Sequence, residues 1–197
     1  MSDSGKSETP RRGPSVAAAV ERLKQGGVVA YPTEGVYGLG CDALDEQAVS
    51  RLLALKHRDA AKGLIVIGAS LLQVESLIHP LTREQREKLE AGWPGPLTWI
   101  VPAASDAPRW LTGGRDTLAV RVPDHALARE LCQQFRGPVV STSANVSGEA
   151  AVRDADAVAR LFPQGVDYLL EGAVGGHGGP SEIRDLLSDR IIRPAQS

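Results

Sequence analysis

The sequence predicts an α/β fold in which helices cover a mixed sheet. Helical and extended hydrophobic patterns alternate along the chain from Ser15 onward. The stretch Leu64–Ile67 is apolar at every position, which is typical of a strand buried on both faces. Helices interleaved with short strands in this way indicate layers of helix packed on sheet. No internal repeat or second linker interrupts the pattern, so we expect a single domain over residues 15–197.

Composition restricts the class of protein. The 197 residues include 22 Lys and Arg against 24 Asp and Glu, a net charge of −2, which argues against a surface devoted to nucleic acid. Cys41 and Cys132 form neither a metal motif nor a disulfide framework. No apolar run approaches the roughly 20 residues that cross a bilayer, and residues 1–14 lack the apolar core of a signal peptide. We therefore expect a soluble cytoplasmic protein with no membrane contact, whose polar residues 1–14 form a disordered tail.

Helices are predicted where apolar residues recur three and four positions apart. The first follows a Ser15 cap, carries apolar residues from Val16 to Leu23, and ends at Gly26. Another begins at Thr82, which a glutamine follows three residues later in the spacing of a capping box. The predicted helices cover residues 16–23, 45–56, 70–78, 82–90, 124–135 and 154–162.

Strands are predicted where short apolar runs stand between turn residues. Val28–Tyr31 is stopped by Pro32, and the rigid turn Trp93–Pro96 precedes a strand that starts at Leu97. The predicted strands cover residues 28–31, 64–67, 97–101, 117–122, 139–141, 166–170, 183–187 and 190–193.

Two polar stretches in the first third of the chain are candidates for ligand binding. Tyr31–Asp42 is a glycine-rich loop that lets a ligand approach the backbone closely, although a structural turn is the commoner explanation and the pattern is neither a dinucleotide nor a Walker motif. The cations of Lys56–Lys62 either complement a helix C-terminus or form a cradle for phosphates around Arg58. The residues alone leave both interpretations open.

Two further candidates lie in the second half. Ser141–Gly148 places hydroxyl and amide groups directly after a strand, where open α/β sheets bind ligands. A structural turn of Ser, Thr and Asn residues explains the stretch equally well. Without a Gly-x-Ser-x-Gly elbow, a nucleophilic serine is not expected. Arg121, Arg184 and Arg193 lie in predicted strands, and a buried arginine requires an anionic partner. That partner is either a ligand or an internal carboxylate. The glycine-rich stretch Gly172–Gly179 is predicted to be a mobile loop or lid.

In their order along the chain, these segments resemble the YrdC/TsaC family of threonylcarbamoyl-AMP synthases, in its compact bacterial form. The resemblance covers about Ser15 to Pro194, and it implies a twisted open mixed sheet, flanked by helices, around a large basic concave cavity. Each motif is weak by itself, whereas the ordered series is specific. The matching motifs are Pro32-Thr33-Glu34 with Tyr37-Gly38-Leu39-Gly40, Lys56-His57-Arg58, Trp93 to Thr98, Leu118 to Pro123, Ser143 to Gly148, and Arg193-Pro194.

The resemblance also implies a reaction. L-threonine, bicarbonate and ATP would give threonylcarbamoyl-adenylate and pyrophosphate, the first half of forming threonylcarbamoyladenosine at position 37 of tRNAs that read codons beginning with A. Mg²⁺ would arrive with ATP, and we expect no organic cofactor and no metal-binding residue. The product would pass to a TsaD-containing complex, with which we expect at most transient contact, and any RNA binding would be weak.

Site residues follow from the same resemblance. It assigns catalysis to Lys56 and Arg58, which we expect to be exposed to solvent or ligand. Longer relatives carry threonine at the position of Gly35 and histidine at that of Ile67, so Thr33 is expected to stand in at the threonine end. The assigned residues are Arg58, Lys62, Thr117, Ser143, Asn145 and Arg193 for ATP, and Thr33, Arg121, Ser141 and Ser181 for threonine.

Two other functions agree with parts of the pattern. A non-catalytic RNA-binding or ribosome-maturation factor would use the same basic cavity, but base-stacking sites set aromatic residues beside cations and the aromatic residues here are few and scattered. The second is a carbamoyl-transfer enzyme, because YrdC-like domains also occur in hydrogenase-maturation proteins. Those proteins carry zinc-finger-like cysteine pairs that this chain lacks.

Overall fold

The computed structural model describes residues 10–195, which contain a mixed sheet of ten strands. The predicted α/β class is therefore confirmed. The strands are β1 (Arg11–Gly13), β2 (Val29–Pro32), β3 (Tyr37–Gly40), β4 (Ile65–Ile67), β5 (Leu97–Pro102), β6 (Thr117–Arg121), β7 (Val139–Ser143), β8 (Tyr168–Leu170), β9 (Glu182–Asp185) and β10 (Ile191–Arg193).

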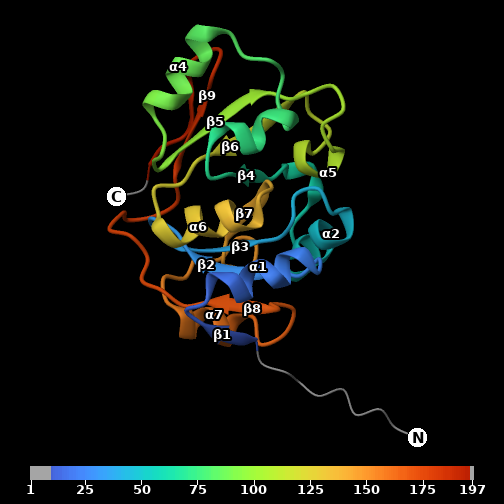
Figure 1. Ribbon diagram of the computed structural model, residues 1–197, viewed down its shortest axis with the longest axis vertical. Coiled ribbons are helices and arrows are strands. Elements are labelled where there is room, and N and C mark those ends of the chain that lie inside the picture. The colour runs from blue at the N-terminus through green and yellow to red at the C-terminus, as the bar shows by residue number, and fades with distance from the viewer. Residues whose placement is uncertain (1–9, 196–197) are drawn as a thin grey trace, which may run out of the picture.

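The sheet has the strand order β1-β8-β2-β3-β7-β4-β6-β5-β9-β10. Figure 1 shows this order from β1 at the bottom to β9 at the top. Neighbours far apart in sequence meet at its centre, where β4 pairs with β7 antiparallel and with β6 parallel. The centre of the sheet thus brings together three strands that are far apart in the sequence, β4, β6 and β7.

Four of the seven α-helices within residues 10–195 begin at a residue whose side chain caps them. The Oγ of Ser15 accepts a hydrogen bond from the Ala18 N–H at 3.2 Å, and Thr82 and Gln85 form the predicted capping box. The helices are α1 (Val16–Lys24), α2 (Glu46–Leu55), α3 (Leu71–Val74), α4 (Arg83–Ala91), α5 (Arg109–Thr112), α6 (Ala126–Phe135) and α7 (Ala155–Leu161), with 3₁₀ turns η1 (Ala60–Lys62) and η2 (Glu75–Leu77).

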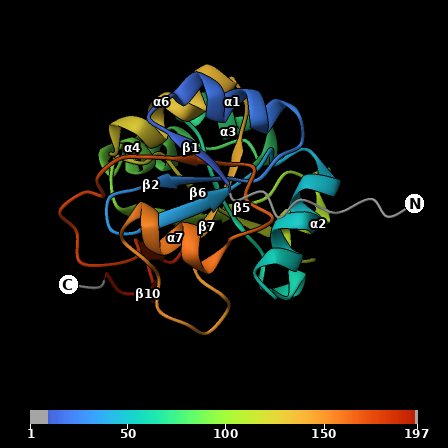
Figure 2. The same ribbon diagram turned by 90° about the horizontal axis from the view of Figure 1, so that it is seen from below.

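Two hydrophobic cores lie on opposite faces of the sheet. Ile67 of β4 packs in one cluster with residues of α1 and α6, whereas its neighbour Val66 packs in the other with residues of α2 and α7. Successive strand residues point to opposite faces, so the two clusters are separated by the sheet. Figure 2 shows α1 and α6 on one side of the strands and α7 on the other. Cys41 and Cys132 are free and buried, one in each cluster.

Three expectations about the elements are wrong. Arg11–Gly13 forms the edge strand β1 in parallel pairing with β8, and Arg12 forms ion pairs with Asp156 and Glu171 at 2.8 and 2.6 Å. This part of the predicted tail is therefore ordered, and residues 1–9 lie outside the described residues. Tyr37–Gly40, expected as loop, is a strand, and α5 has no counterpart among the predicted helices. None of the helices within residues 10–195 is long and apolar enough to cross a membrane.

Candidate active site

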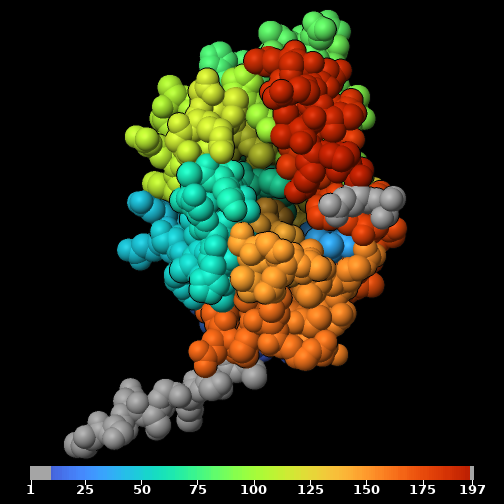
Figure 3. Space-filling view, turned by 180° about the vertical axis from the view of Figure 1, so that it is seen from behind, coloured from blue at the N-terminus to red at the C-terminus, as the bar shows by residue number. Residues whose placement is uncertain are grey.

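A cavity of about 430 Å³ opens between the central strands and the C-terminal segment. Its walls come from the turn after β2, from η1, from β4, β6 and β7, and from residues 179–193. Figure 3 shows the molecule hollowed between the red C-terminal strands, the cyan segment after α2 and the orange segment after β7. A cavity of this volume is in the range of about 300–1,000 Å³ that holds small ligands.

Strand register explains which side chains meet in the cavity. Ile65 of β4 is opposite Ser141 of β7 on one side and Ala119 of β6 on the other, and Ile67 is opposite Arg121. Alternate residues of each strand share a face, so these side chains line one wall. The predicted site residues on the cavity lining are Thr33, Arg58, Lys62, Thr117, Arg121, Ser141, Ser143, Ser181 and Arg193; Lys56 and Asn145 are not on it.

One end of the cavity carries positive charge without internal counterions. Arg58 donates from Nη2 to the Gly63 carbonyl at 2.9 Å, and its buried Nε has no partner. Burial lowers the pKa of Arg58 and, together with the charges of Arg121 and Arg58, that of Arg193. Within residues 10–195, no carboxylate lies within 4.0 Å of the cations of Arg58, Lys62 or Arg193. A polyanionic ligand would supply the missing negative charge.

Lys56 does not face this cavity. It is only 2% exposed, and its ammonium donates to the backbone carbonyls of Ser143 and Asn145, the latter at 2.6 Å. The Oδ1 of Asn145 is the third acceptor, at 3.4 Å. Burial, followed by the charge of Arg58, lowers the pKa of Lys56 to about 8. The expectation that Lys56 is exposed to solvent or ligand is therefore wrong, because the loop after β7 takes up its donors.

Asn145 belongs to the same hydrogen-bonded arrangement. Its Oδ1 accepts a hydrogen bond from the Ser143 hydroxyl at 2.6 Å, and its Nδ2 donates to the Glu149 carbonyl at 2.7 Å. Asn145 thus fixes the loop, while Ser143 reaches the cavity lining. Lys56 and Asn145 act on the cavity through the position of Ser143.

At the other end, Arg121 forms an ion pair with Glu34. The Oε1 of Glu34 also accepts a hydrogen bond from the Asp124 N–H at 2.7 Å, and the Nε of Arg121 donates to the Gly95 carbonyl at 3.0 Å. The Nη1 of Arg121 makes no hydrogen bond to the residues that the structure describes, and the side chain lines the cavity. The sequence left open whether the partner of Arg121 is a ligand or an internal carboxylate. In the structure an internal carboxylate holds the guanidinium, and its Nη1 is left for a ligand.

Arg193 and Ser181 enter the cavity from the C-terminal segment. Arg193 donates from Nη2 to the Ser181 carbonyl at 2.7 Å, and the Ser181 hydroxyl is 2.8 Å from that of Thr98. The Thr33 hydroxyl donates to the Val36 carbonyl at 2.7 Å, which closes the turn between β2 and β3. Arg184, the remaining strand arginine, is paired with Glu182 at 2.8 Å and lies outside the lining.

Two charged lining residues were not assigned from the sequence. Glu34 lies in the motif Pro32-Thr33-Glu34, and the need of the strand residue Arg121 for a carboxylate was the signal that could have identified it. Arg115 lies beside Gly63: a Cβ added to Gly63 would be 3.0 Å from the Arg115 Nη1. Arg115 follows the short α5 in a glycine-rich segment, and no periodic pattern marks it in the sequence.

The donor set of the cavity does not fit a resident divalent cation. Among residues 10–195, Glu34 is the only carboxylate on its lining, and it is paired with Arg121. Over the described ranges, no three His, Cys, Asp or Glu side chains are grouped as metal ligands. Magnesium prefers carboxylate, phosphate and water oxygens, so in this cavity it would depend on oxygens that a ligand brings.

Proteins of known sequence resemble this chain over most of its length. The threonylcarbamoyl-AMP synthase of Cellvibrio japonicus is 48% identical over 182 residues, which cover 92% of this chain and 96% of the relative. That of Halorhodospira halophila is 50% identical over 178 residues, covering 90% and 93%. The agreement thus extends across nearly the full length of both proteins.

Solved structures agree with the fold. The structure of P. abyssi Sua5 complexed with L-threonine matches with a TM-score of 0.86 and 36% identity, and covers 94% of this chain. This chain spans 56% of that Sua5 chain. E. coli YciO matches with a TM-score of 0.80 at 24% identity, over 94% of this chain and 93% of its own, which supports the fold alone.

A family model agrees with both comparisons. The model for Sua5, YciO and YrdC proteins, described as telomere recombination, matches residues 21–195. Those residues include every segment that lines the cavity. The chain belongs to the Sua5/YciO/YrdC family.

Proposed function

We propose that this protein is a threonylcarbamoyl-AMP synthase, a nucleotidyltransferase that acts in tRNA modification. The observation that carries the proposal is the cavity with two different ends. One end gathers Arg58, Lys62 and Arg193 without counterions, as a triphosphate requires, and the other presents Arg121 beside its Glu34 partner, as an amino-acid carboxylate requires. Relatives of that name at close to half identity support the same activity.

The reaction takes two steps in this cavity. The threonine amine, as its ammonium form, combines with bicarbonate to give a carbamate, water and a proton. A carbamate oxygen then attacks the α-phosphorus of ATP; the new P–O bond forms as the bond to pyrophosphate breaks. Neither step needs a covalent enzyme nucleophile, so positioning and charge neutralisation supply the catalysis. This agrees with a lining of cations and hydroxyls.

At the triphosphate end, Arg58 and Lys62 neutralise the charge of the phosphates. Arg58 is held against Gly63 with its buried Nε still unpartnered, so its remaining donors are directed at a ligand. The Ser143 hydroxyl and Thr117 contact the nucleotide from β7 and β6. Lys56 is a positioning residue, because its contacts are to the backbone of Ser143 at the end of β7 and of Asn145 just after it.

At the amino-acid end, the Nη1 of Arg121 binds the threonine carboxylate. Thr33, Ser141 and Ser181 line the same end, and their hydroxyls are suited to the polar groups of threonine and bicarbonate. The Thr33 hydroxyl donates its hydrogen to Val36. Its lone pairs therefore accept from the substrate.

Mg²⁺ enters as part of the nucleotide substrate, and the protein adds no ligand set of its own. The adenylate product passes by transient contact to the TsaD-containing complex that modifies position 37 of tRNA. The protein acts in the cytoplasm, where its substrates and tRNA are available, and RNA contact at the basic cavity is weak.

Pyrophosphate release from ATP by the purified protein tests the proposal. L-threonine and bicarbonate are omitted in turn, with dissolved carbon dioxide removed. Release that requires both supports the synthase. Release with threonine alone indicates ordinary amino-acid adenylation, and an absence of release combined with salt-sensitive RNA binding indicates a binding protein; either outcome contradicts the proposal.

A further inference from the structure

The segment between β8 and β9, residues 172–180, crosses the amino-acid end of the cavity, and we refer to it as the strap. Its backbone is bound to the turn after β2: the Gly175 N–H donates to the Thr33 carbonyl at 2.9 Å, and the His177 N–H donates to the Glu34 carbonyl at 3.1 Å. Gly179 and Pro180 of the strap lie on the cavity lining.

The two backbones meet too closely for side chains. A Cβ on Gly35 would stand 2.7 Å from the carbonyl carbon of Gly179 and closer still to its oxygen. A Cβ on Gly175 would stand 2.7 Å from the Glu34 carbonyl oxygen and 2.9 Å from its Cα. Neither glycine has positive φ, so the close approach, and not the backbone conformation, is what requires glycine at both positions.

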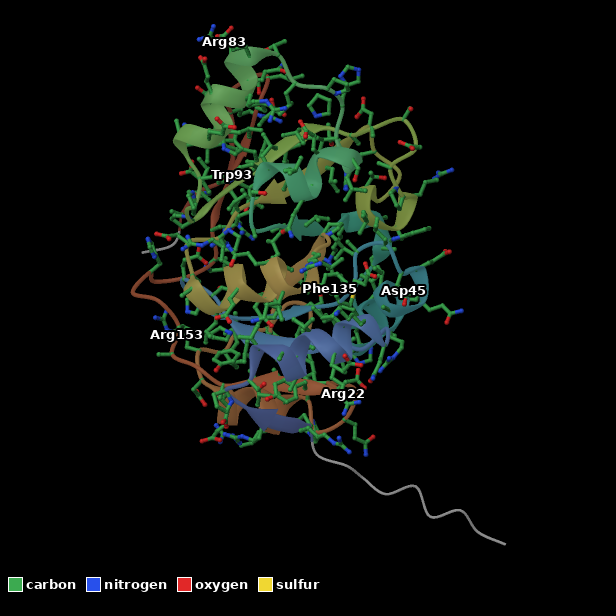
Figure 4. The ribbon with its side chains drawn as sticks, in the orientation of Figure 1. Arg22, Asp45, Arg83, Trp93, Phe135 and Arg153 are labelled. Carbon is green, nitrogen blue, oxygen red and sulfur yellow. The ribbon has the colours of Figure 1, made fainter. Side chains whose placement is uncertain are left out.

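The outer side of the strap is also bound. Arg153 donates from Nη1 to the His177 carbonyl at 2.9 Å, and the Nε2 of His125 is 3.0 Å from the Ala173 carbonyl. Figure 4 shows Arg153 beside this segment, at the edge of the molecule. The strap is therefore held from two directions.

The turn that the strap holds carries Glu34, and Glu34 holds Arg121. The Oε1 of Glu34 pairs with the Nη2 of Arg121 and accepts a hydrogen bond from the Asp124 N–H. The Glu34 side chain is 4% exposed. Displacing the turn would move this oxygen and release the Nη2 side of the guanidinium. A charge-assisted hydrogen bond of the remaining nitrogen to a carboxylate depends on that orientation.

We propose that the strap is a positioning element of the amino-acid end: by docking on residues 33–35 it fixes Glu34, and through Glu34 the direction in which Arg121 faces the cavity. This rests on the proposed function only in the identity of the ligand, an α-amino acid carboxylate. Gly35 and Gly175 are required because each lies where the two backbones meet.

Three glycine-to-alanine variants test this inference in the full chain. G35A and G175A introduce a methyl group from opposite sides of the same contact. G176A is the matched control, because a Cβ on Gly176 meets no atom within 4 Å. The dissociation constant of L-threonine is measured by titration calorimetry, which does not require turnover, and that of a non-hydrolysable ATP analogue is measured in parallel.

We expect G35A and G175A to weaken threonine binding about tenfold or more, with ATP-analogue binding changed less than twofold. G176A should bind both ligands as the parent does, and limited proteolysis should cleave the strap faster in G35A and G175A only. E34Q, which leaves the strap contacts intact, should weaken threonine binding without faster cleavage, and it keeps the test open if a glycine variant does not fold.

The result that would overturn the inference is unchanged threonine affinity in G35A, G175A and E34Q, or an equal loss of ATP-analogue affinity. A parent protein that does not bind threonine would also overturn it. Threonine binding without pyrophosphate release in the parent would contradict the proposed function and leave the strap inference supported.

Discussion

The ammonium of Lys56 lies 2.6 Å from the backbone carbonyl oxygen of Asn145, in a site that is 2% exposed. A lysine held in this way joins the end of α2 to the loop after β7, with its charge compensated by carbonyl dipoles rather than by a carboxylate. Its contribution to the cavity is therefore geometric.

Replacing Lys56 should consequently affect both stability and nucleotide binding. K56M removes the donors: the Asn145 carbonyl loses its partner, and the Ser143 carbonyl keeps only the Asn145 N–H. Each unsatisfied buried group costs about 1–3 kcal/mol. We expect a lower melting temperature and a higher KM for ATP, measured by calorimetry and by pyrophosphate release. A K56M protein with unchanged stability and abolished turnover would instead indicate direct contact with the phosphates.

The burial of Lys56 should also make the stability of the protein depend on pH. The pKa of Lys56 is about 8 in the folded protein against 10.5 for the free side chain, so between these values the unfolded chain binds the extra proton. Stability contributed by this group therefore rises with pH from about 8 to 10.5. The difference in unfolding free energy between the parent protein and K56M should grow in that window; a flat difference would contradict the lowered pKa.

Arg58 should be the more direct catalytic residue. R58A is expected to lower kcat/KM by about 10²–10³, the range for loss of a preorganised charge-stabilising donor, while circular dichroism shows a folded protein. R109A is the matched control, since Arg109 is exposed and lies outside the cavity lining. Equal effects of the two substitutions would contradict a phosphate-binding role for Arg58.

Arg115 should contribute to the binding of the leaving group. It lies across Gly63 from Arg58, and within residues 10–195 it has no ion-pair partner. R115A is expected to raise the KM for ATP and the inhibition constant of pyrophosphate about tenfold, with the KM for threonine unchanged. Inhibition by added pyrophosphate measures this directly, and unchanged inhibition would place Arg115 outside the reaction.

Removal of Arg121 alone should leave Glu34 buried without its counterion. Breaking such a pair costs about 3–5 kcal/mol, so R121M should lower the unfolding free energy and abolish threonine binding. The double variant E34Q/R121M is expected to recover part of the stability and none of the threonine binding. Recovery of both would show that the pair is structural and does not bind substrate.

The N-terminal edge strand should matter for stability. Deletion of residues 1–13 removes β1, its pairing with β8, and the ion pairs of Arg12. We expect a loss of about 1 kcal/mol or more in unfolding free energy, measured against a chain that lacks residues 1–9 and retains β1. Equal stability of the two chains would return Arg11–Gly13 to the tail that the sequence alone predicted.

Much of the fold could be predicted because its signals are local. The capping residues Thr82 and Gln85 predict the start of helix α4, and an unbroken apolar run predicts strand β4. The strand Tyr37–Gly40 could not be recognised, since Gly40 is required where its backbone passes the Val140 carbonyl, and glycines at that spacing also predict a loop. Strand β1 depends on β8, more than 150 residues away in sequence.

Which residues belong to the candidate site could be predicted better than how they are arranged in it. Residue type indicated that Arg58, Arg121 and Ser143 are suited to a charged ligand, and all three line one cavity. Residue type could not tell that Lys56 points away from the cavity, because the acceptors of its ammonium are backbone carbonyls that exist only once β7 is paired. Glu34 was overlooked for the same reason: its role is set by Arg121, across the sheet.

The burial of both cysteines has a practical consequence for spectroscopy. Cys41 and Cys132 are 0% exposed, and burial raises the pKa of each thiol, that of Cys132 to about 12. Because the thiolate is the reactive form, neither should take up a maleimide dye while the protein is folded. A single cysteine introduced at Gly176 would then be the labelling site, and a fluorophore there would report on the glycine-rich segment in the otherwise native chain.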